Sequence, residues 1–279
     1  LRTYTIVTAD GGVDGEFAAV TSDFAFLDPT LSYDPNNVYL TLIRNDVDFG
    51  AIGLTPNQIA TGNGTESLGL GNSVYDAVLG LSAAQARGAF DLLSGEIHAS
   101  AKSVLIDDSR FVREAAIDRL RAALGGVGAS AAPVMAYGEG GPHSAAPTTD
   151  RFAIWGQGFG SWGQIDGDGN AAQTNSSTGG FFLGADAPVF ETWRLGIIAG
   201  YSRTNFDVDA RASSGSSDNY PLGVYAGTQW GNLGFRSGLA YTWHEIDTSR
   251  SVAFPGFSEN LTSSYDASTF QAFGEFGYR

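Results

Sequence analysis

Two motifs in this sequence contain residue types that could bind a ligand. Residues 158–163, GFGSWG, match the G-x-G-x-x-G pattern of dinucleotide sites, but DGDGN follows soon after, where such a site needs a helix N-terminus. Asp166 begins a run that starts like a calcium loop, yet Ala171 occupies the usual glycine position and Ser177 stands where a bidentate glutamate is required. Strand glycines and a polar surface loop explain both patterns better, so we expect no cofactor and no metal site.

The sequence also contains no recognisable set of catalytic residues. The histidines, His98, His143 and His244, have no apparent nucleophile near them in sequence, and the chain has no G-x-S-x-G motif, no P-loop and no cysteine. The net charge is −15 and Lys102 is the only lysine, which disfavours nucleic-acid binding because phosphate recognition needs clustered cations. We therefore expect that this chain is not itself an enzyme.

The elements that carry these residues in the C-terminal half are predicted strands. In residues 232–244, NLGFRSGLAYTWH, large apolar side chains alternate with small, polar or charged ones, and a side-chain period of two predicts a strand. The same period recurs across residues 151–279 and predicts about six antiparallel strands. The candidates lie near 151–160, 179–187, 192–206, 219–229, 232–245 and 266–279.

The connections between these strands alternate in length. Long polar segments are predicted at 166–177, 207–218 and 246–264, whereas short turns are predicted around Pro188–Glu191 and at 231–232. This alternation is typical of an up-and-down outer-membrane barrel, with long loops on one side and tight turns on the other. A soluble sandwich of Greek keys is the alternative, but it would not be expected to keep the alternation.

In an outer-membrane barrel, one face of every strand contacts lipid and the other faces the lumen. The apolar face is predicted to contact lipid at Leu195, Ile197, Leu222, Val224, Leu233, Phe235, Leu239, Phe270 and Phe276. The aromatic side chains predicted to lie at the two membrane interfaces are Trp193 and Trp230 on the short-turn side and Tyr201, Tyr241 and Trp243 on the long-loop side. The polar face is predicted to line the lumen at Arg194, Gln229, Arg236, Gln271 and Glu275.

The N-terminal half divides into three predicted segments. Residues 1–50 are β-type, because β-branched and aromatic residues flank turn-forming sequences. Residues 51–124 change to a helical period, and their last helix carries an apolar stripe with mixed charge on its other faces. Residues 125–150 contain mainly Gly, Ala, Pro and Ser, and this composition predicts a linker that does not pack.

The order of these segments resembles the C-terminal region of bacterial autotransporters, the proteins of type V secretion. Residues 4–45, from YTIVTADGG to VYLTLIRN, look like the passenger end, where the last rungs of a β-helix carry a similar aromatic and glycine pattern. Residues 81–122, from LSAAQARGAFDLL to AAIDRLRA, are similar to the helical junction before the translocator. Residues 151–186, from RFAIWGQGFGSW to GGFFLGAD, resemble the start of the autotransporter β-domain.

The resemblance implies a fold that is mostly β with a helical middle. Residues 1–50 would be a passenger C-terminal β-solenoid or autochaperone-like segment, residues 51–124 the helical junction, residues 125–150 the linker, and residues 151–279 a partial β-barrel domain. The family's barrel has about twelve strands and ends in an aromatic residue. This chain ends in Arg279 after about half of them, so we expect a fragment of a longer protein.

The function implied by the resemblance is that of a translocator in the bacterial outer membrane. It would carry its own N-terminal passenger to the cell surface and anchor it there, with outer-membrane lipid, the barrel-assembly machinery and the passenger segment as partners. The passenger could be a hydrolase or protease, or a surface adhesin, and a pore without any passenger is disfavoured by the β-type start. Either the helix ending at Leu124 or the linker after it could occupy the lumen.

Overall fold

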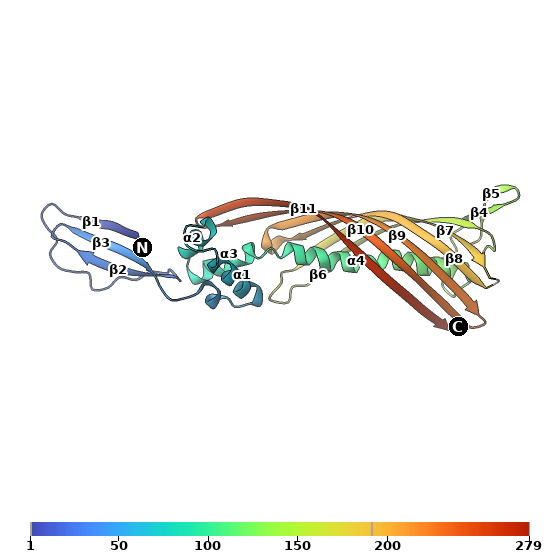
Figure 1. The fold of residues 1–279 in the computed structure, drawn as a ribbon, viewed down its shortest axis with the longest axis horizontal. Coiled ribbons are helices and arrows are strands. Elements are labelled where there is room, and N and C mark those ends of the chain that lie inside the picture. Colours follow the sequence, from blue (N-terminus) through green and yellow to red (C-terminus); the bar gives the residue numbers. More distant parts are fainter. Residues whose placement is uncertain (1, 191, 279) are drawn as a thin grey trace.

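The computed structural model of this chain describes residues 2–190 and 192–278. The predictions that place Glu191 in a turn and Arg279 at the end of a partial barrel therefore fall, with Leu1, outside the described residues. The described parts lie in line, with a small N-terminal sheet at one end, short helices in the middle and a large curved sheet at the other end (Figure 1). A long helix runs beside the large sheet.

The large sheet is antiparallel throughout. Its strand order is β11-β10-β9-β8-β7-β6-β4-β5. The strands are β4 (Val134–Gly138), β5 (Gly141–Ala145), β6 (Ala153–Ile165), β7 (Thr174–Val189), β8 (Trp193–Val208), β9 (Ser213–Trp230), β10 (Leu233–Phe254) and β11 (Phe257–Tyr278). Among the described residues its ends do not meet, so it is an incomplete barrel. The predicted fold class, mostly β with a helical middle and an incomplete antiparallel barrel, is confirmed.

Two of the predicted long loops are wrong, because they are extensions of the strands. β10 and β11 remain paired up to Phe254 and Phe257, where residues 246–264 were expected to form a loop. β8 and β9 likewise leave only a short 3₁₀ helix, Asp209–Arg211, within the second predicted loop. The period of two continues through buried Ile246 and Val252. The side chains of the opposite face become polar in this part of the strands, so the segment lacks the large apolar side chains by which the other strands were predicted.

The predicted linker is also wrong in part. Residues 134–145 form the hairpin β4–β5, which joins β6 through two residue pairs, Met135 with Ile154 and Ala136 with Ala153. Val134 and Ala136 are buried. Small side chains allow this hairpin to pack without much apolar bulk, so the composition was a poor guide to its structure.

The helical segment begins where capping residues predict it. Thr55 caps α1 (Pro56–Glu66), Asn72 caps α2 (Ser73–Leu79), and Ser82 forms a capping box with Gln85 at α3 (Ala83–Leu93). The long helix α4 (Ile97–Ala123) follows, and Gly125, with a φ of +68°, lies just beyond its end. None of the described helices combines the length and apolarity that a membrane-spanning helix requires.

The N-terminal sheet has the order β1-β3-β2 and consists of β1 (Arg2–Thr8), β2 (Leu27–Tyr33) and β3 (Asn37–Arg44). Asp34 organises the turn between β2 and β3. Its carboxylate accepts hydrogen bonds from the backbone N–H groups of Asn36 and Asn37 at 2.8 and 2.7 Å and from the Tyr39 hydroxyl at 2.6 Å. One carboxylate therefore fixes the turn that sets the register of this sheet.

Replacing Asp34 with asparagine should loosen the β2–β3 turn at neutral pH and have less effect in acid. The hydrogen bond from Tyr39, followed by those from Asn36 and Asn37, lowers the pKa of the Asp34 carboxyl to about 2. Because this folded pKa is below the ordinary one, the stabilisation is present above about pH 4 and is lost as the pH falls toward the folded value. Hydrogen-exchange protection of β2 and β3 measured across this range checks the prediction, with the exposed Asp14→Asn as control. An effect of Asp34→Asn that does not change with pH would contradict it.

Candidate functional site

Helix α4 packs along one face of the large sheet, called the inner face here; the opposite face is the outer face (Figure 1). Its first half forms an apolar cluster with Phe206 of β8 and Ile246 of β10. Its second half packs against Phe182 of β7 and Ile198 of β8. The predicted apolar stripe of α4 is buried along its length at Ala101, Leu105, Val112, Ala116 and Leu120. Of the two candidates for the lumen, the helix therefore lies on the inner face.

Glycines on the inner face allow close approach. A β-carbon added to Gly227 of β9 would lie 3.1 Å from Leu120 Cδ2 of α4, so the helix touches the strand backbone there. A β-carbon on Gly196 of β8 would lie 2.3 Å from the ring of Tyr225 on β9. Tyr225 therefore lies flat across the neighbouring strand, and this leaves room for α4 above it.

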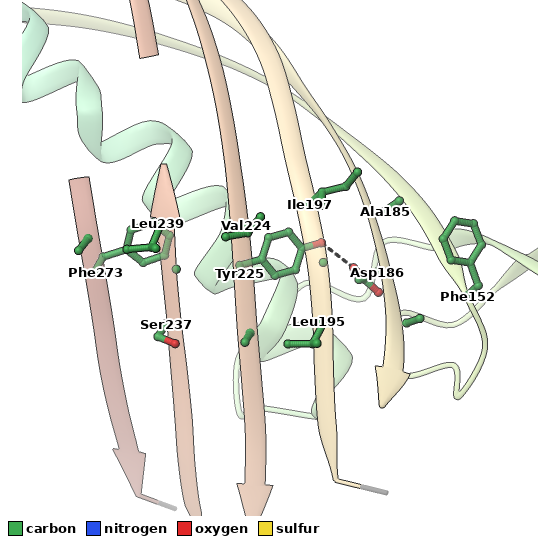
Figure 2. A pocket seen from close by; sticks show the side chains of 15 residues that line it. Phe152, Ala185, Asp186, Leu195, Ile197, Val224, Tyr225, Ser237, Leu239 and Phe273 are labelled. Carbon is green, nitrogen blue, oxygen red and sulfur yellow. Dashed lines mark hydrogen bonds between the residues drawn. The ribbon is translucent and has the colours of Figure 1, made fainter. Parts of the chain in front are cut away.

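A buried ion network joins α4 to the sheet at Asp186 of β7. Arg119 of α4 donates from Nε to Oδ2 at 2.7 Å and from Nη2 to Oδ1 at 2.8 Å, and Arg194 of β8 donates from Nε to Oδ1 at 2.5 Å. The Tyr225 hydroxyl donates to Oδ2 at 2.8 Å (Figure 2) and accepts from Trp155 Nε1 at 2.7 Å. The Asp186 side chain has no exposed surface, so one fully buried carboxylate lies between two guanidinium groups.

The same two arginines also hold the chain that leads into β6. Arg119 Nη1 donates to the Pro147 carbonyl oxygen at 2.9 Å. Arg194 donates from Nη1 to the Thr149 carbonyl oxygen at 2.6 Å and from Nη2 to that of Arg151 at 3.1 Å. The network thus connects α4, the segment before β6, β7 and β8, and it fixes the rotation of the helix about its axis.

A second polar network crosses the middle of the inner face. Asp108 of α4 accepts from the hydroxyls of Thr178 at 2.8 Å and Thr204 at 2.6 Å. Asn219 donates to Thr204 at 3.0 Å, and its carbonyl oxygen lies 2.7 Å from His244 Nδ1. These hydrogen bonds form a continuous row from the helix across β7, β8, β9 and β10.

A third contact lies near the C-terminal end of α4. Glu275 of β11 accepts a hydrogen bond from Arg236 Nη1 of β10 at 2.8 Å and pairs with Arg121 of the helix. Because this pair is more exposed than the one at Asp186, we assign it a smaller contribution to stability. The three networks hold α4 from both flanks, because Asp108 and Arg119 bind β7 and β8 whereas Arg121, about 200° from Arg119 around the helix, binds β11.

The residues predicted to line the lumen are placed as follows. Arg194 and Glu275 belong to the networks around α4, and Arg236 joins the same network through Glu275. Gln271 donates to a backbone carbonyl oxygen of α4 at 2.9 Å. Gln229 instead donates to the Gly231 carbonyl oxygen of its own turn, at 2.8 Å.

The residues that organise this face are not among those predicted from the sequence to line the lumen. Asp186 ends a predicted strand, and Asp108 is one of the mixed charges on the last predicted helix. Asp186 sits within GADAPV, at a position whose period assigns it to the polar face, and a lone carboxylate among such small residues is a signal for a buried ion pair. The helical period distinguishes Asp108 from its neighbour Asp107, because Asp108 lies three residues after Leu105 and four before Val112 of the apolar stripe and so points at the sheet.

The side chains predicted to contact lipid lie on the outer face. Most of them are well exposed, with exposed fractions such as 58% for Ile197 and 71% for Phe276. The rows of large side chains enclose a shallow apolar hollow of about 660 Å³ between Phe152, Leu195 and Leu239 (Figure 2). The predicted interface aromatics pair with one another: the rings of Trp193 and Trp230 lie 6.0 Å apart and those of Tyr241 and Trp243 lie 4.6 Å apart, whereas Tyr201 lies 5.6 Å from Tyr220.

Comparisons with known proteins agree with this architecture. Residues 154–279 match the family model of the autotransporter beta-domain. Two relatives are extracellular serine proteases of Serratia marcescens. One is 33% identical over 317 aligned residues, and the other is 31% identical over the same length. Each alignment covers 99% of this chain but 29% of the relative, so the chain spans less than a third of these curated relatives. No solved structure matches the chain significantly.

An antiparallel sheet with an apolar outer face, a polar inner face and a helix held along it is the architecture of an outer-membrane translocator. Residues 154–279 are therefore an autotransporter β-domain, a domain of the bacterial outer membrane.

Replacing Asp186 with alanine should destabilise the β-domain by about 3–5 kcal/mol, because it leaves two buried guanidinium groups without their carboxylate. Denaturant unfolding of the full-length protein in detergent measures this change. The matched control is Asp107→Ala, which removes an exposed carboxylate paired with Arg110 and should cost at most about 1 kcal/mol. Equal losses in the two variants would contradict the assignment.

Proposed function

We propose that β6–β11 form part of the wall of the export pore and that α4 is the segment of exported chain that stays in the lumen afterwards. The observation that carries this proposal is the buried Arg119–Asp186–Arg194 network, which ties the helix to the wall. The helix has 27 residues, so it is about 40 Å long at ~1.5 Å per residue and exceeds an apolar band of about 25 Å. α4 would therefore close the lumen and anchor whatever precedes it at the surface.

We propose that lipid covers the outer face. No other part of the chain that the structure describes covers the exposed Leu, Ile, Val and Phe side chains there, and in a bilayer these side chains would contact hydrocarbon instead of water. The pair Trp193–Trp230 lies at the short-turn end of β8 and β9, whereas the pair Tyr241–Trp243 lies midway along β10, and this separation suits two membrane interfaces, where amphipathic rings are favoured.

We further propose that the barrel-assembly machinery inserts this domain. In hydrocarbon each unpaired backbone N–H or C=O group costs several kcal/mol. Antiparallel strands such as β6–β11 therefore need a protein that shields their edges while they insert and pair.

The passenger is proposed to be a surface protease. The support is the printed name of the two relatives, both extracellular serine proteases, whose alignments with this chain cover nearly all of it. An adhesin is the competing passenger. Labelling of the complete protein with a fluorophosphonate probe for active serines separates the two, because an adhesin would not react.

Cysteine pairs test the position of the helix in the complete protein, since the chain has no cysteine of its own. Leu120→Cys with Gly227→Cys should be linked by a short thiol cross-linker in surface-displayed protein, because the Leu120 side chain contacts Gly227. Ala136→Cys with Gly227→Cys is the control and should not link. Linking of the control pair alone, in protein whose passenger is exported, would show that residues 125–150 fill the lumen instead.

Lipid contact predicts an asymmetry between the faces of one strand pair. Leu239→Arg, at mid-strand on the outer face, should destabilise the domain in a bilayer by about 2–4 kcal/mol. Gln271→Arg, at the same level on the inner face, should cost much less because arginine can still donate to the helix carbonyl. Gly238→Arg is not a usable control, since a β-carbon there would lie 2.4 Å from Phe273. Equal costs for Leu239→Arg and Gln271→Arg, measured by unfolding in lipid vesicles, would refute lipid contact.

A further inference from the structure

The hairpin β4–β5 lies beside β6 at the short-turn end of the large sheet, where β9 turns into β10 (Figure 1). Its first strand is tied to the beginning of β6. Met135 is the register partner of Ile154, and the Tyr137 backbone N–H donates to the Phe152 carbonyl oxygen at 3.0 Å. The hairpin therefore continues the sheet, and each of its side chains belongs to one of the two faces.

The inner face of the hairpin is packed against the rest of the chain. Val134 and Ala136 are buried, and Ala136 is opposite Ala153 of β6, which is buried as well. Val134 belongs to the apolar cluster that also contains Leu120 of α4 and Trp155 of β6. These contacts fix which way the hairpin faces, so the residues between them in sequence point outward.

The outer face of the hairpin continues a row of side chains that crosses the sheet. Register partners in antiparallel strands lie on the same face, so the row can be followed from strand to strand. It runs from β4 to β10 through Met135, Ile154, Ala185, Ile197, Val224 and Leu239. Met135 is 50% exposed, much like Ile197 at 58%. Met135 thus ends a row that contains three of the residues predicted to contact lipid.

The next outward side chain of β4 adjoins the apolar hollow of the outer face. The ring of Tyr137 is exposed and lies 5.6 Å from that of Phe152. Phe152 lines the hollow together with Leu195 (Figure 2). The Tyr137 hydroxyl lies 3.7 Å from the Met135 sulfur, a weak acceptor, so it is available to a lipid headgroup or to water. An apolar ring with an available hydroxyl suits a membrane interface.

We propose that the hairpin β4–β5 extends the lipid-contacting surface of the domain. Met135 and Tyr137 insert into the phospholipid leaflet at the short-turn end, and the polar tip, residues 138–141, lies among its headgroups. The proposal rests on the proposed lipid contact of the outer face and extends it to the segment between α4 and β6. Continuity of the row selects lipid as the occupant, because a partner protein on Met135 would have to reach into the bilayer that covers Ile197 and Leu239.

Lipid contact supplies stability that the hairpin lacks by itself. A lone two-stranded hairpin is marginal in water, and among the described residues β4 joins β6 through two residue pairs. Insertion of Met135 and Tyr137 removes their apolar area from water and so favours the docked hairpin. The segment that follows the hairpin supplies the carbonyl oxygens bound by Arg119 and Arg194. Lipid on the outside thus supports the geometry of the buried network on the inside.

Spin labels test this in the full-length protein, reconstituted into vesicles of phosphatidylethanolamine and phosphatidylglycerol after any cysteine outside residues 1–279 is replaced by serine. A nitroxide on Met135→Cys is relaxed by molecular oxygen, which concentrates in hydrocarbon, or by a water-soluble nickel chelate. We expect oxygen to be the stronger relaxant. The matched control is His143→Cys, which is exposed on the inner face of the same hairpin, opposite Ala136, and should favour the nickel chelate.

Two further labels keep the test decisive. Ser144→Cys replaces an exposed residue opposite Met135 on β5 and should also favour oxygen. It decides the matter if Met135→Cys disturbs assembly of the domain, as judged by heat-modifiable migration in gels. Ile197→Cys, in the same row on β8, reports the lipid contact on which the proposal rests.

The outcomes separate the hairpin from the rest of the outer face. Oxygen dominance at Met135→Cys and Ile197→Cys, with nickel dominance at His143→Cys, supports the proposal. Nickel dominance at Met135→Cys, or protection there from both relaxants by a covering protein, overturns it while Ile197→Cys still favours oxygen. Oxygen dominance at His143→Cys also overturns it, because the hairpin would then have no water-facing side. Nickel dominance at Ile197→Cys refutes the proposed lipid contact itself, and the hairpin proposal with it.

Discussion

The constraint on which the rest of the structure depends is the burial of Asp186 between two arginines. A carboxylate without exposed surface is tolerated only when its charge is balanced and its oxygen atoms are hydrogen-bonded. Here the balancing groups come from α4 and β8, and their remaining donors bind carbonyl oxygens of the segment before β6. The network can form only when helix, strands and entering chain are all in place. It therefore sets the helix rotation that brings Asp108 to Thr178 and Thr204 farther along the same face.

One alternating pattern gives the two faces of the sheet different side chains, each suited to a different environment. The outer face presents large apolar side chains, as a surface in contact with lipid requires. The inner face combines polar groups with glycines, and the glycines let aromatic rings lie flat on the wall and let Leu120 approach the backbone at Gly227. An inner wall of this kind is compatible with an extended polar chain during export and with a packed helix afterwards. The same surface can thus serve as both a passage and a binding site.

The strands do not stop at the apolar band. β10 and β11 continue as a hairpin that supplies Phe254 to a core shared with the helical segment, and that core also contains Phe26 at the entry to the N-terminal sheet. One apolar core therefore joins the β-domain, the helical segment and the start of β2 in this chain. Between α4 and β6, the segment expected to be a linker, residues 125–150, contributes residues 134–145 to the sheet as the hairpin β4–β5.

The sequence by itself determined the alternating strands, the two faces, the helical middle and the resemblance to autotransporters, because each depends on local periodicity or motif order. Only the tertiary structure decided that α4 covers the inner face along its length while the linker meets it only beside β6, that Asp186 and Asp108 join helix and sheet, and that the expected loops are strand. Those features depend on which way a side chain points once distant segments meet. Asp107 and Asp108 have the same chemistry and adjacent positions, yet one pairs with Arg110 at the surface and the other binds the sheet, because successive helical residues point about 100° apart.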